Sequence, residues 1–321
     1  MAEPQREVNS VAPSSLKHLI GQRSVIDQVS VALDAAQMDG NRFDHAMLVG
    51  PPGLGKSALA SIVAAEMATD FHEVLGQSLK HPSDLNALLL AAQDRSIVHV
   101  DEAHELPKPM QTALYLALDK QRLVLGSAGG KSPQTIPLAN FTLLLSTTDE
   151  YGLLQPLRDR CRLVLRFDFY TSKDLTTVIY QRAKALGWDI HEELLPQIAQ
   201  RAKGTPRLGL RLLQACRRVC RAEGEQTITL DHLNRACGLE QIDATGLGPT
   251  EQKYLAALAD AGGVGRLNVV ASMLGLPSRT VAEVVEPFLL RSAYIVKDDQ
   301  GKRQLTAEGR EIVSNSRAND A

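Results

Sequence analysis

The first half of the chain alternates short apolar runs with segments of helical periodicity. The apolar runs are too short for helices and lie at 46–49, 97–100 and 141–145. Helical periodicity separates them, at 24–38, 56–67, 85–93 and 109–119. Apolar strands that alternate with helices are typical of a parallel sheet covered by helices on both faces. We therefore predict an α/β fold for this half of the chain.

The second half lacks a strand pattern until close to its end. Residues 172–240 have the pattern of helices only, with a break at Gly224. A linker pattern at 246–249 precedes three helical segments and a short hairpin, which is the order of elements in a winged-helix domain. The sequence thus predicts four regions: a disordered lead at 1–15, an α/β core at 16–171, a helical segment at 172–243 and a winged-helix domain at 244–321.

A glycine-rich loop joins the first apolar run to the helix that follows it. The loop matches the P-loop pattern G-x-x-x-x-G-K-[ST] in full and consists of Gly50, Pro51, Pro52, Gly53, Leu54, Gly55, Lys56 and Ser57. In such a loop the backbone N–H groups and the helix N-terminus surround the β-phosphate, the lysine binds the β- and γ-phosphate oxygens, and the hydroxyl binds Mg²⁺. We therefore predict that ATP and Mg²⁺ are the cofactors, and that Ala58, in the first turn of the helix, also lines the nucleotide site.

Two acidic residues, Asp101 and Glu102, directly follow the second apolar run. In P-loop enzymes an acid at this place holds the metal ion, and its neighbour can polarise the attacking water. We predict that Asp101 binds Mg²⁺ together with Ser57 and that Glu102 activates the water. An acidic pair after a strand is more often a solvated strand end, but its place some 45 residues behind a P-loop favours catalysis. The letters Asp-Glu-Ala-His also spell a helicase motif, although the chain lacks the second core of such helicases.

Three further places hold polar residues that a P-loop enzyme can use. A hydroxyl of Thr147 or Thr148, at the end of the third apolar run, would either sense the γ-phosphate or cap the strand. Arg158 and Arg160 flank an acid and are compatible with a surface ion pair alone. Arg207 opens a helix after a glycine-containing break, from where it could fold over the nucleotide.

Composition narrows the class of protein without identifying its ligands. The formal net charge is −2, so any nucleic-acid site has to be a local basic patch. The four cysteines, at 161, 216, 220 and 237, lack zinc-ligand spacing, and we predict that they are buried thiols. The sequence has no apolar run of about 18 residues and no signal-peptide pattern, which predicts a cytoplasmic protein.

The order of these motifs resembles that of AAA+ ATPases and, more narrowly, that of the RuvB family, whose members drive branch migration of Holliday junctions. The resemblance covers roughly residues 15–310. Besides the P-loop and the acidic pair, it rests on Ile20-Gly21-Gln22, Asp44-His45, Pro156–Arg160, Gly204–Arg207 and Glu286-Pro287.

The resemblance implies a helical AAA+ lid at 172–243 and roles for single residues. Thr148, or else Thr147, would be the first sensor of the γ-phosphate. Arg160 would be the arginine finger that reaches the ATP of the neighbouring subunit, with Arg158 as the alternative. Arg207 would be the second sensor, and Ile20 would line the nucleotide site.

The resemblance also implies partners. The subunits would form a ring, taken to be a hexamer, and a hairpin at 122–138 that turns at Gly129-Gly130 would dock a RuvA-type junction-binding protein. The winged helix would contact DNA through Lys302 and Arg303. Three departures from the family are visible. Ala12-Pro13-Ser14 stands where the family usually has a basic stretch, and Asp149 stands where it commonly has arginine. The wing at 297–303 contains two aspartates, which would repel DNA phosphates.

We therefore expect an ATP-hydrolysing ring motor that moves four-way junction DNA. Two other functions stay open. The first is an AAA+ loader or remodeller that acts on a protein client, which lacks a DNA-stimulated ATPase rate. The second is a non-catalytic DNA-binding regulator with a vestigial nucleotide switch, which any steady ATP turnover excludes.

Overall fold

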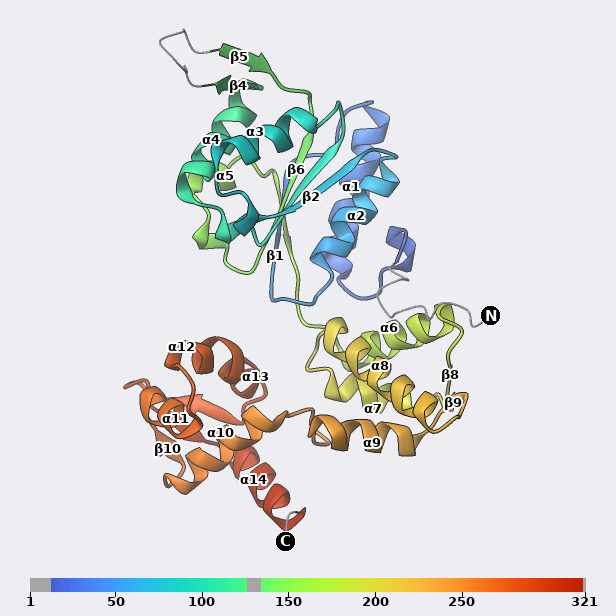
Figure 1. Cartoon of the computed structure of the whole chain (residues 1–321), viewed down its shortest axis with the longest axis vertical. Helices are drawn as coiled ribbons and strands as arrows, with labels where there is room; N and C mark the ends of the chain where they lie inside the picture. Colours follow the sequence, from blue (N-terminus) through green and yellow to red (C-terminus); the bar gives the residue numbers. More distant parts are fainter. Residues whose placement is uncertain (1–12, 126–133, 320–321) are drawn as a thin grey trace. The chain divides into compact units, whose positions relative to one another are not determined.

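A computed structural model of the chain describes residues 13–125 and 134–319 (Figure 1). It forms two compact units. The first contains the chain up to Leu186 together with Gly204–Arg207, and the second contains Gly187–Lys203 and the chain from Leu208 onward. Most of the predicted lead at 1–15, and the predicted turn at Gly129-Gly130, lie outside the described residues. The boundaries at 15/16, 171/172 and 243/244, which divide the chain into four regions, stay a prediction.

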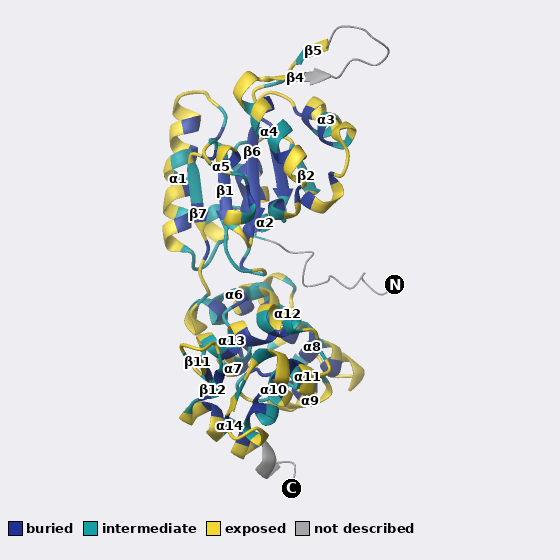
Figure 2. Cartoon of the chain, turned by 90° about the vertical axis from the view of Figure 1, so that its left-hand side faces the viewer, coloured by how far each residue is buried: buried dark blue, intermediate teal, exposed yellow. Residues whose placement is uncertain are grey.

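The first unit is built on a parallel five-stranded sheet in the order β2-β3-β6-β1-β7. Its strands are β1 (Ala46–Val49), β2 (Phe71–Leu75), β3 (Ile97–Asp101), β6 (Thr142–Thr147) and β7 (Leu163–Arg166). Figure 2 shows the central strands as buried. Alternate residues of each strand point to opposite faces, so Met47 and Leu48 of β1 belong to two different hydrophobic cores.

Helices cover both faces of this sheet, which confirms the predicted α/β core. The core around Leu48 contains α1 (Arg23–Met38) and α2 (Lys56–Glu66). The core around Met47 contains α3 (Pro82–Ala91) and α4 (Lys108–Lys120), and it includes Leu157 of the short helix α5 (Gln155–Arg158). Because β1, β3 and β6 are covered on both faces, they are nearly continuous apolar runs, and this pattern made them recognisable.

The predicted hairpin is present as two antiparallel strands, β4 (Arg122–Leu125) and β5 (Gln134–Pro137). Leu123 pairs with Ile136, as the apolar residues of the two segments suggested. The strands extend from the end of α4 (Figure 1). The residues that join them are not described.

The chain between the sheet and the winged helix contains α6 (Ser172–Ala185), α7 (Leu194–Arg201), α8 (Pro206–Ala222) and α9 (Leu230–Glu240). The prediction of helices only was wrong in one detail. Two short strands, β8 (Asp189–Ile190) and β9 (Thr227–Ile228), pair in parallel. Strands of two residues are too short to produce an alternating pattern that a sequence can reveal.

The C-terminal part has the predicted winged-helix order. It consists of α10 (Pro249–Asp260), β10 (Val264–Gly265), α11 (Leu267–Leu274), α12 (Ser278–Thr280), a π-helical turn (Val281–Val285), α13 (Glu286–Arg291), β11 (Ile295–Lys297), β12 (Arg303–Leu305) and α14 (Ala307–Asn319). The three strands form an antiparallel sheet in the order β10-β12-β11. Among the helices that the structure describes, none is both long and apolar enough to cross a membrane.

Candidate nucleotide-binding site

The P-loop joins β1 to α2 at the carboxyl edge of the sheet. Gly50 has φ +151°, and a Cβ added there would lie 2.6 Å from the carbonyl oxygen of Phe167. Gly55 precedes α2 with φ +97°, in the left-handed region that favours glycine. Leu54 is fully buried and anchors the loop. The backbone conformation of the loop therefore requires glycine at these two positions. In this conformation the N–H groups of the loop are available to an anion.

Lys56 lies across this loop. Its Nζ donates hydrogen bonds to the carbonyl oxygens of Gly50, at 2.7 Å, and Pro51, at 2.9 Å. Burial lowers the pKa of Lys56, and the negative charges of Glu102 and Asp101 partly offset that effect. The ammonium is thus desolvated and held where the loop would bind phosphate.

Ser57 and Asp101 meet at one point, as predicted for a metal site. Ser57 Oγ donates a hydrogen bond of 3.1 Å to Asp101 Oδ2. Neighbouring oxygens around Mg²⁺ lie about 2.9 Å apart, given octahedral bonds of 2.0–2.1 Å, so the two atoms fit one edge of such a site. The oxygen chemistry of this pair also suits Mg²⁺.

Glu102 follows Asp101 in a left-handed backbone conformation, with φ 49° and ψ 47°. Its backbone N–H donates to Asp101 Oδ1 at 3.0 Å, and its side chain is 43% exposed. A left-handed non-glycine residue is uncommon and marks a place where the surrounding structure fixes the backbone. The structure therefore places this carboxylate beside the metal-site oxygens but leaves it open to solvent.

The two candidate sensor hydroxyls have different environments. Thr147 is fully buried, and its Oγ1 bonds the backbone N–H and carbonyl of Asp149. Thr148 is exposed at the end of β6. Thr148 is thus the hydroxyl that can reach a ligand, while Thr147 is committed to the protein. Asp149, the departure from the family, caps the following turn by accepting from the N–H groups of Tyr151 and Gly152.

Arg160 bonds Asp119 of α4 instead of the adjacent acid that its sequence neighbourhood suggested. Its Nε donates to Asp119 Oδ1 at 2.8 Å and its second nitrogen to Oδ2 at 2.5 Å. The side chain is 31% exposed, and the guanidinium lies 5.5 Å from the ring centre of Tyr115. Arg158 instead bonds the side chain of Gln155. Each of the two arginines is therefore paired with a neighbouring side chain of the same chain.

Arg207 and the segment around Ile20 are placed near the P-loop. The backbone N–H of Arg207 donates to the carbonyl oxygen of Gly53 at 3.4 Å, and its side chain is exposed. Ile20 is half-buried next to Gly21, which packs on the ring of Tyr170. The hydroxyl of Tyr170 donates to the carbonyl oxygen of Leu54 at 3.4 Å, which connects this segment to the loop.

Arg303 does not fit its predicted contact with DNA. It is 9% exposed, and its guanidinium donates to both carboxylate oxygens of Glu286, at 2.8 and 3.0 Å. Glu286 is fully buried and also accepts from the hydroxyl of Tyr254 at 3.0 Å. Leaving this carboxylate unpaired would be costly, so Arg303 is held inside the domain.

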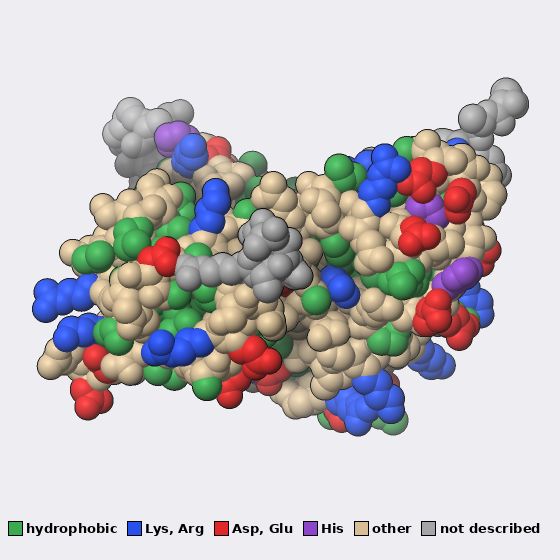
Figure 3. Space-filling view, turned by 90° about the horizontal axis from the view of Figure 1, so that it is seen from below, with side chains coloured by type: hydrophobic (Ala, Val, Ile, Leu, Met, Phe, Trp, Pro, Cys, Tyr) green, Lys and Arg blue, Asp and Glu red, His purple; other side chains and the backbone are tan. Residues whose placement is uncertain are grey.

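The wing itself is organised by one of its two aspartates. Asp298 Oδ1 accepts from the N–H groups of Gln300, at 2.9 Å, and Lys302, at 2.8 Å. Lys302 keeps a partly exposed side chain. Basic and acidic side chains are interspersed over the face that Figure 3 shows. The wing therefore retains Lys302 as a candidate phosphate contact, and Asp298 serves the turn.

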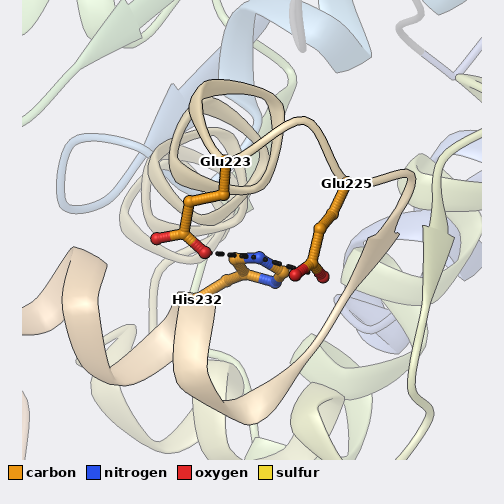
Figure 4. Close-up of side chains that lie close together, drawn as sticks. All are labelled: Glu223, Glu225 and His232. Carbon is orange, nitrogen blue, oxygen red and sulfur yellow. Dashed lines mark ion pairs between the residues drawn. The ribbon is translucent and has the colours of Figure 1, made fainter.

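A second cluster of ionisable groups joins the segment after α8 to the first turn of α9, and consists of Glu223, Glu225 and His232 (Figure 4). His232 Nε2 is buried and lies 3.1 Å from Glu223 and 3.5 Å from Glu225. Its Nδ1 accepts from the backbone N–H of Thr229 at 2.9 Å, so the ring proton resides on Nε2. A metal ion would need the lone pair of that nitrogen. We therefore interpret the cluster as an electrostatic contact that stabilises the start of α9.

Sequence patterns also missed a row of polar side chains across three strands, in which His99 and Ser146 are buried and Glu73 is exposed. His99 of β3 is fully buried, with Nδ1 3.0 Å from Glu73 of β2 and Nε2 2.8 Å from Ser146 of β6. Burial lowers the pKa of His99, against the opposing effects of Asp101 and Glu73. This row connects β3, which ends at the acidic pair, to β6, which ends at the candidate sensor hydroxyl.

Comparisons with known proteins agree with this architecture. Residues 11–167 match the Holliday junction DNA helicase RuvB P-loop domain, residues 170–243 the RuvB AAA lid domain, and residues 244–314 the RuvB C-terminal winged helix domain.

Relatives match over nearly the whole chain. A Holliday junction branch migration complex subunit RuvB from Anaeromyxobacter sp. (strain K) is 36% identical over 307 residues, which cover 94% of this chain and 90% of the relative. The corresponding protein of Thermotoga petrophila is 34% identical over 299 residues, which cover 92% of this chain and 90% of the relative. The solved structure of the Thermotoga maritima RuvB Holliday junction branch migration motor superimposes with a TM-score of 0.82 and 33% identity, over 94% of this chain and 97% of that structure. Identity at this level over this share of the chain means that the protein belongs to the RuvB family.

Proposed function

We propose that the protein is an ATP-hydrolysing ring motor that drives branch migration of Holliday junction DNA in recombination and repair. The observation that carries this proposal is the meeting of Lys56, Ser57, Asp101 and Glu102 at one edge of the sheet. The desolvated ammonium of Lys56 offers a point charge to phosphate. Ser57 and Asp101 offer a metal ion two oxygen ligands, whose atoms lie 3.1 Å apart. The names of relatives that cover most of this chain supply the substrate.

Each residue of the site has a distinct task in this proposal. The N–H groups of the P-loop and Lys56 bind the phosphates, and Ala58 and Ile20 line the nucleotide. Ser57 and Asp101 hold Mg²⁺, which neutralises negative charge on the phosphates when bound. Glu102 orients and polarises the attacking water. Thr148 senses the γ-phosphate, because its hydroxyl is the exposed one of the two.

Arg160 acts in the neighbouring subunit. An arginine supplied in trans stabilises the charge of the transition state only when the ring is assembled, which ties hydrolysis to assembly. In the single subunit its guanidinium rests on Asp119, at the surface, and it would exchange this carboxylate for phosphate oxygens at a subunit boundary. Arg207 serves as the second sensor from its place against Gly53. Such head-to-tail contacts between identical subunits close into rings, here proposed to be hexameric.

The DNA and protein contacts lie outside the ATPase site. We assign a phosphate contact to Lys302 on the wing and leave Arg303 out, because it is paired internally with Glu286. The hairpin of β4 and β5 docks a RuvA-type protein. A cytoplasmic location stays a prediction from the sequence.

One experiment tests the proposal and separates it from other functions. ATPase rates are measured without DNA, with linear duplex and with a four-way junction, each with and without a RuvA-type protein. We expect Mg²⁺-dependent hydrolysis that the junction and the RuvA-type protein together stimulate most. Hydrolysis that no DNA changes would favour a remodeller of a protein client. No turnover under any condition would leave only a nucleotide-binding regulator.

A further inference from the structure

His104 lies between the acidic pair at the end of β3 and the buried hydroxyl at the end of β6. Its Nδ1 is 3.1 Å from Thr147 Oγ1, and its Nε2 is 3.5 Å from Glu102 Oε2. The ring is 18% exposed, and its Cβ packs against Gly152, where an added methyl group would lie 3.0 Å away. The imidazole thus connects two neighbouring strands immediately beside the candidate catalytic acid.

The hydrogen bonds of Thr147 determine which nitrogen of His104 carries a proton. Thr147 Oγ1 lies 2.9 Å from the carbonyl oxygen of Asp149, and a carbonyl can only accept, so the hydroxyl proton is donated there. The same oxygen accepts from the N–H of Asp149 at 3.0 Å. The second lone pair of Thr147 Oγ1 can only accept a hydrogen bond. Nδ1 of His104 must therefore be the donor in this contact and carry a proton.

With a proton on Nδ1, the interaction between His104 and Glu102 depends on whether Nε2 also carries a proton. A neutral ring with its proton on Nδ1 turns the lone pair of Nε2 toward the carboxylate, and two acceptors repel each other. A ring that also carries a proton on Nε2 attracts the carboxylate as an ion pair. The separation of 3.5 Å is an ion-pair distance that a small rotation of Glu102 would shorten to a hydrogen bond.

Glu102 needs such a partner. Its backbone is fixed in the left-handed region, but its side chain is long and 43% exposed, so several rotamers are open to it. Hydrolysis requires a rotamer that directs the carboxylate at the attacking water. The ring of His104 is anchored on Thr147 and lies within reach of the carboxylate, so it favours the rotamers of Glu102 near the sheet edge.

We propose that His104 is a positioning residue for hydrolysis, which holds Glu102 in its water-activating orientation and connects it to the strand that ends at Thr148. The inference rests on the proposed ATPase function and on the proposed role of Glu102. His104 itself touches neither ATP nor the attacking water. Loss or gain of the γ-phosphate at Thr148 would then be transmitted to Glu102 through Thr147 and His104.

Two conservative substitutions separate the two sides of the ring. The amide of asparagine can replace Nδ1 and keep the bond to Thr147, but it ends short of Glu102. The amide of glutamine reaches the position of Nε2 and can still donate to Glu102. Glu105→Gln is the matched control, because Glu105 Oε1 is the other carboxylate near Nε2, at 3.6 Å, and it is 59% exposed.

The experiment measures single-turnover ATP hydrolysis with Mg²⁺ and junction DNA, and ATP affinity by calorimetry, for wild type and each variant. We expect His104→Asn to lower the hydrolysis rate about 10- to 100-fold, the scale for a misplaced catalytic group, with ATP affinity within about twofold. His104→Gln should retain most of the rate, and Glu105→Gln all of it. Thermal melting of each variant verifies that it is folded.

A double-mutant comparison completes the test. In a Glu102→Gln background, which is slow by itself, His104→Asn should lower the rate less than about twofold further, because residues that act as a unit are not additive. A normal rate in His104→Asn with a slow Glu102→Gln variant would overturn the role of His104 and leave the proposed function intact. Full additivity of the two changes would also overturn it. A normal rate in Glu102→Gln would remove the proposed role of Glu102, and the inference with it.

Discussion

Lys56 shows how much of nucleotide binding rests on a single residue. Its ammonium has exchanged water for the carbonyl oxygens of Gly50 and Pro51, and burial lowers its pKa. Phosphate oxygens would pair with this desolvated charge far better than neutral carbonyls do. The site is therefore prepared for an anion before one binds.

We expect Lys56→Ala to weaken ATP binding about 30-fold or more, since truncating one partner of a buried charged pair costs 2–5 kcal/mol. Calorimetric titration with ATP and Mg²⁺ measures the effect. Lys80→Ala is a suitable control, because Lys80 is an exposed lysine outside the P-loop. An unchanged affinity in Lys56→Ala would exclude this lysine from the phosphate site.

Arg160 and Asp119 allow a matched pair of tests. If Arg160 is a finger in trans, Arg160→Ala should lower hydrolysis by about 10³ and leave ATP binding nearly intact. Asp119→Asn removes only the local partner and keeps the finger, so its hydrolysis should stay close to wild type. ATPase rates and ATP affinities of both variants decide. Near-normal hydrolysis in both would mean that the surface pair is the whole role of Arg160.

Single residues divide into those that sequence could reveal and those that it could not. The P-loop and Asp101-Glu102 are recognisable because their chemistry requires fixed residue types at fixed spacing. His104 was visible only as the last letter of a helicase-like motif, and its contact with Thr147 joins residues 43 positions apart. Asp119 meets Arg160 across 41 positions. Such contacts depend on how strands and helices pack, which no local pattern encodes.

At the scale of elements, the order of strands in the sheet explains which of them could be predicted. The central strands β1, β3 and β6 are buried along nearly their full length and appear as apolar runs. The edge strands β2 and β7 are only partly buried, and residues such as Glu73 and Arg166 interrupt their apolar pattern. An edge strand has one neighbour and more solvent, so it can carry charges that conceal it.

The wing depends on a buried carboxylate that acid should neutralise. Burial alone would raise the pKa of Glu286, but hydrogen bonds from Arg303, Lys297 and Tyr254 outweigh it and hold the pKa below its usual 4.5. A carboxyl whose pKa is lower in the folded chain than in the unfolded chain stabilises the fold at any pH above its pKa in the unfolded chain. This stability is lost as the pH falls through its pKa in the folded chain. Thermal unfolding from pH 7 down to below pH 4 should therefore show a loss of winged-helix stability that begins below about pH 5.

Glu286→Gln tests the same element at neutral pH. We expect it to destabilise the winged helix by about 3–5 kcal/mol, because it leaves the charge of Arg303 unpaired in the interior. Denaturant unfolding measures the change. Stability equal to wild type, with an unaltered pH profile, would show that the network around Glu286 contributes little.

The proposed contact between Lys302 of the wing and a DNA phosphate can be tested by the salt dependence of binding. If it contacts a phosphate, Lys302→Ala should reduce the slope of log affinity against log salt by about 0.9, one charge's worth, with the same effect on any DNA sequence. Junction binding is titrated at several salt concentrations for wild type and variant. Arg303→Ala is not equivalent, since it should destabilise the domain. An unchanged slope in Lys302→Ala would leave this lysine as a solvated turn residue.

At the scale of the whole molecule, the proposed motor divides each active site between two neighbouring subunits. The P-loop, the acidic pair and the sensor belong to one subunit, whereas Arg160, which pairs with Asp119, is proposed to complete the site of the next subunit. Hydrolysis would then require neighbours, and the ring would deliver its work to DNA.

The most direct test is junction dissociation by mixed rings. Lys56→Ala, which lacks a working pocket, and Arg160→Ala, which lacks the finger, are assayed alone and in equal mixture with ATP, Mg²⁺, a labelled four-way junction and a RuvA-type protein. Each variant alone should leave the junction intact. The mixture should recover part of the wild-type rate, because some interfaces then pair an intact pocket with an intact finger. An inactive mixture in rings shown to contain both variants, or normal dissociation by Arg160→Ala alone, would contradict the shared active site.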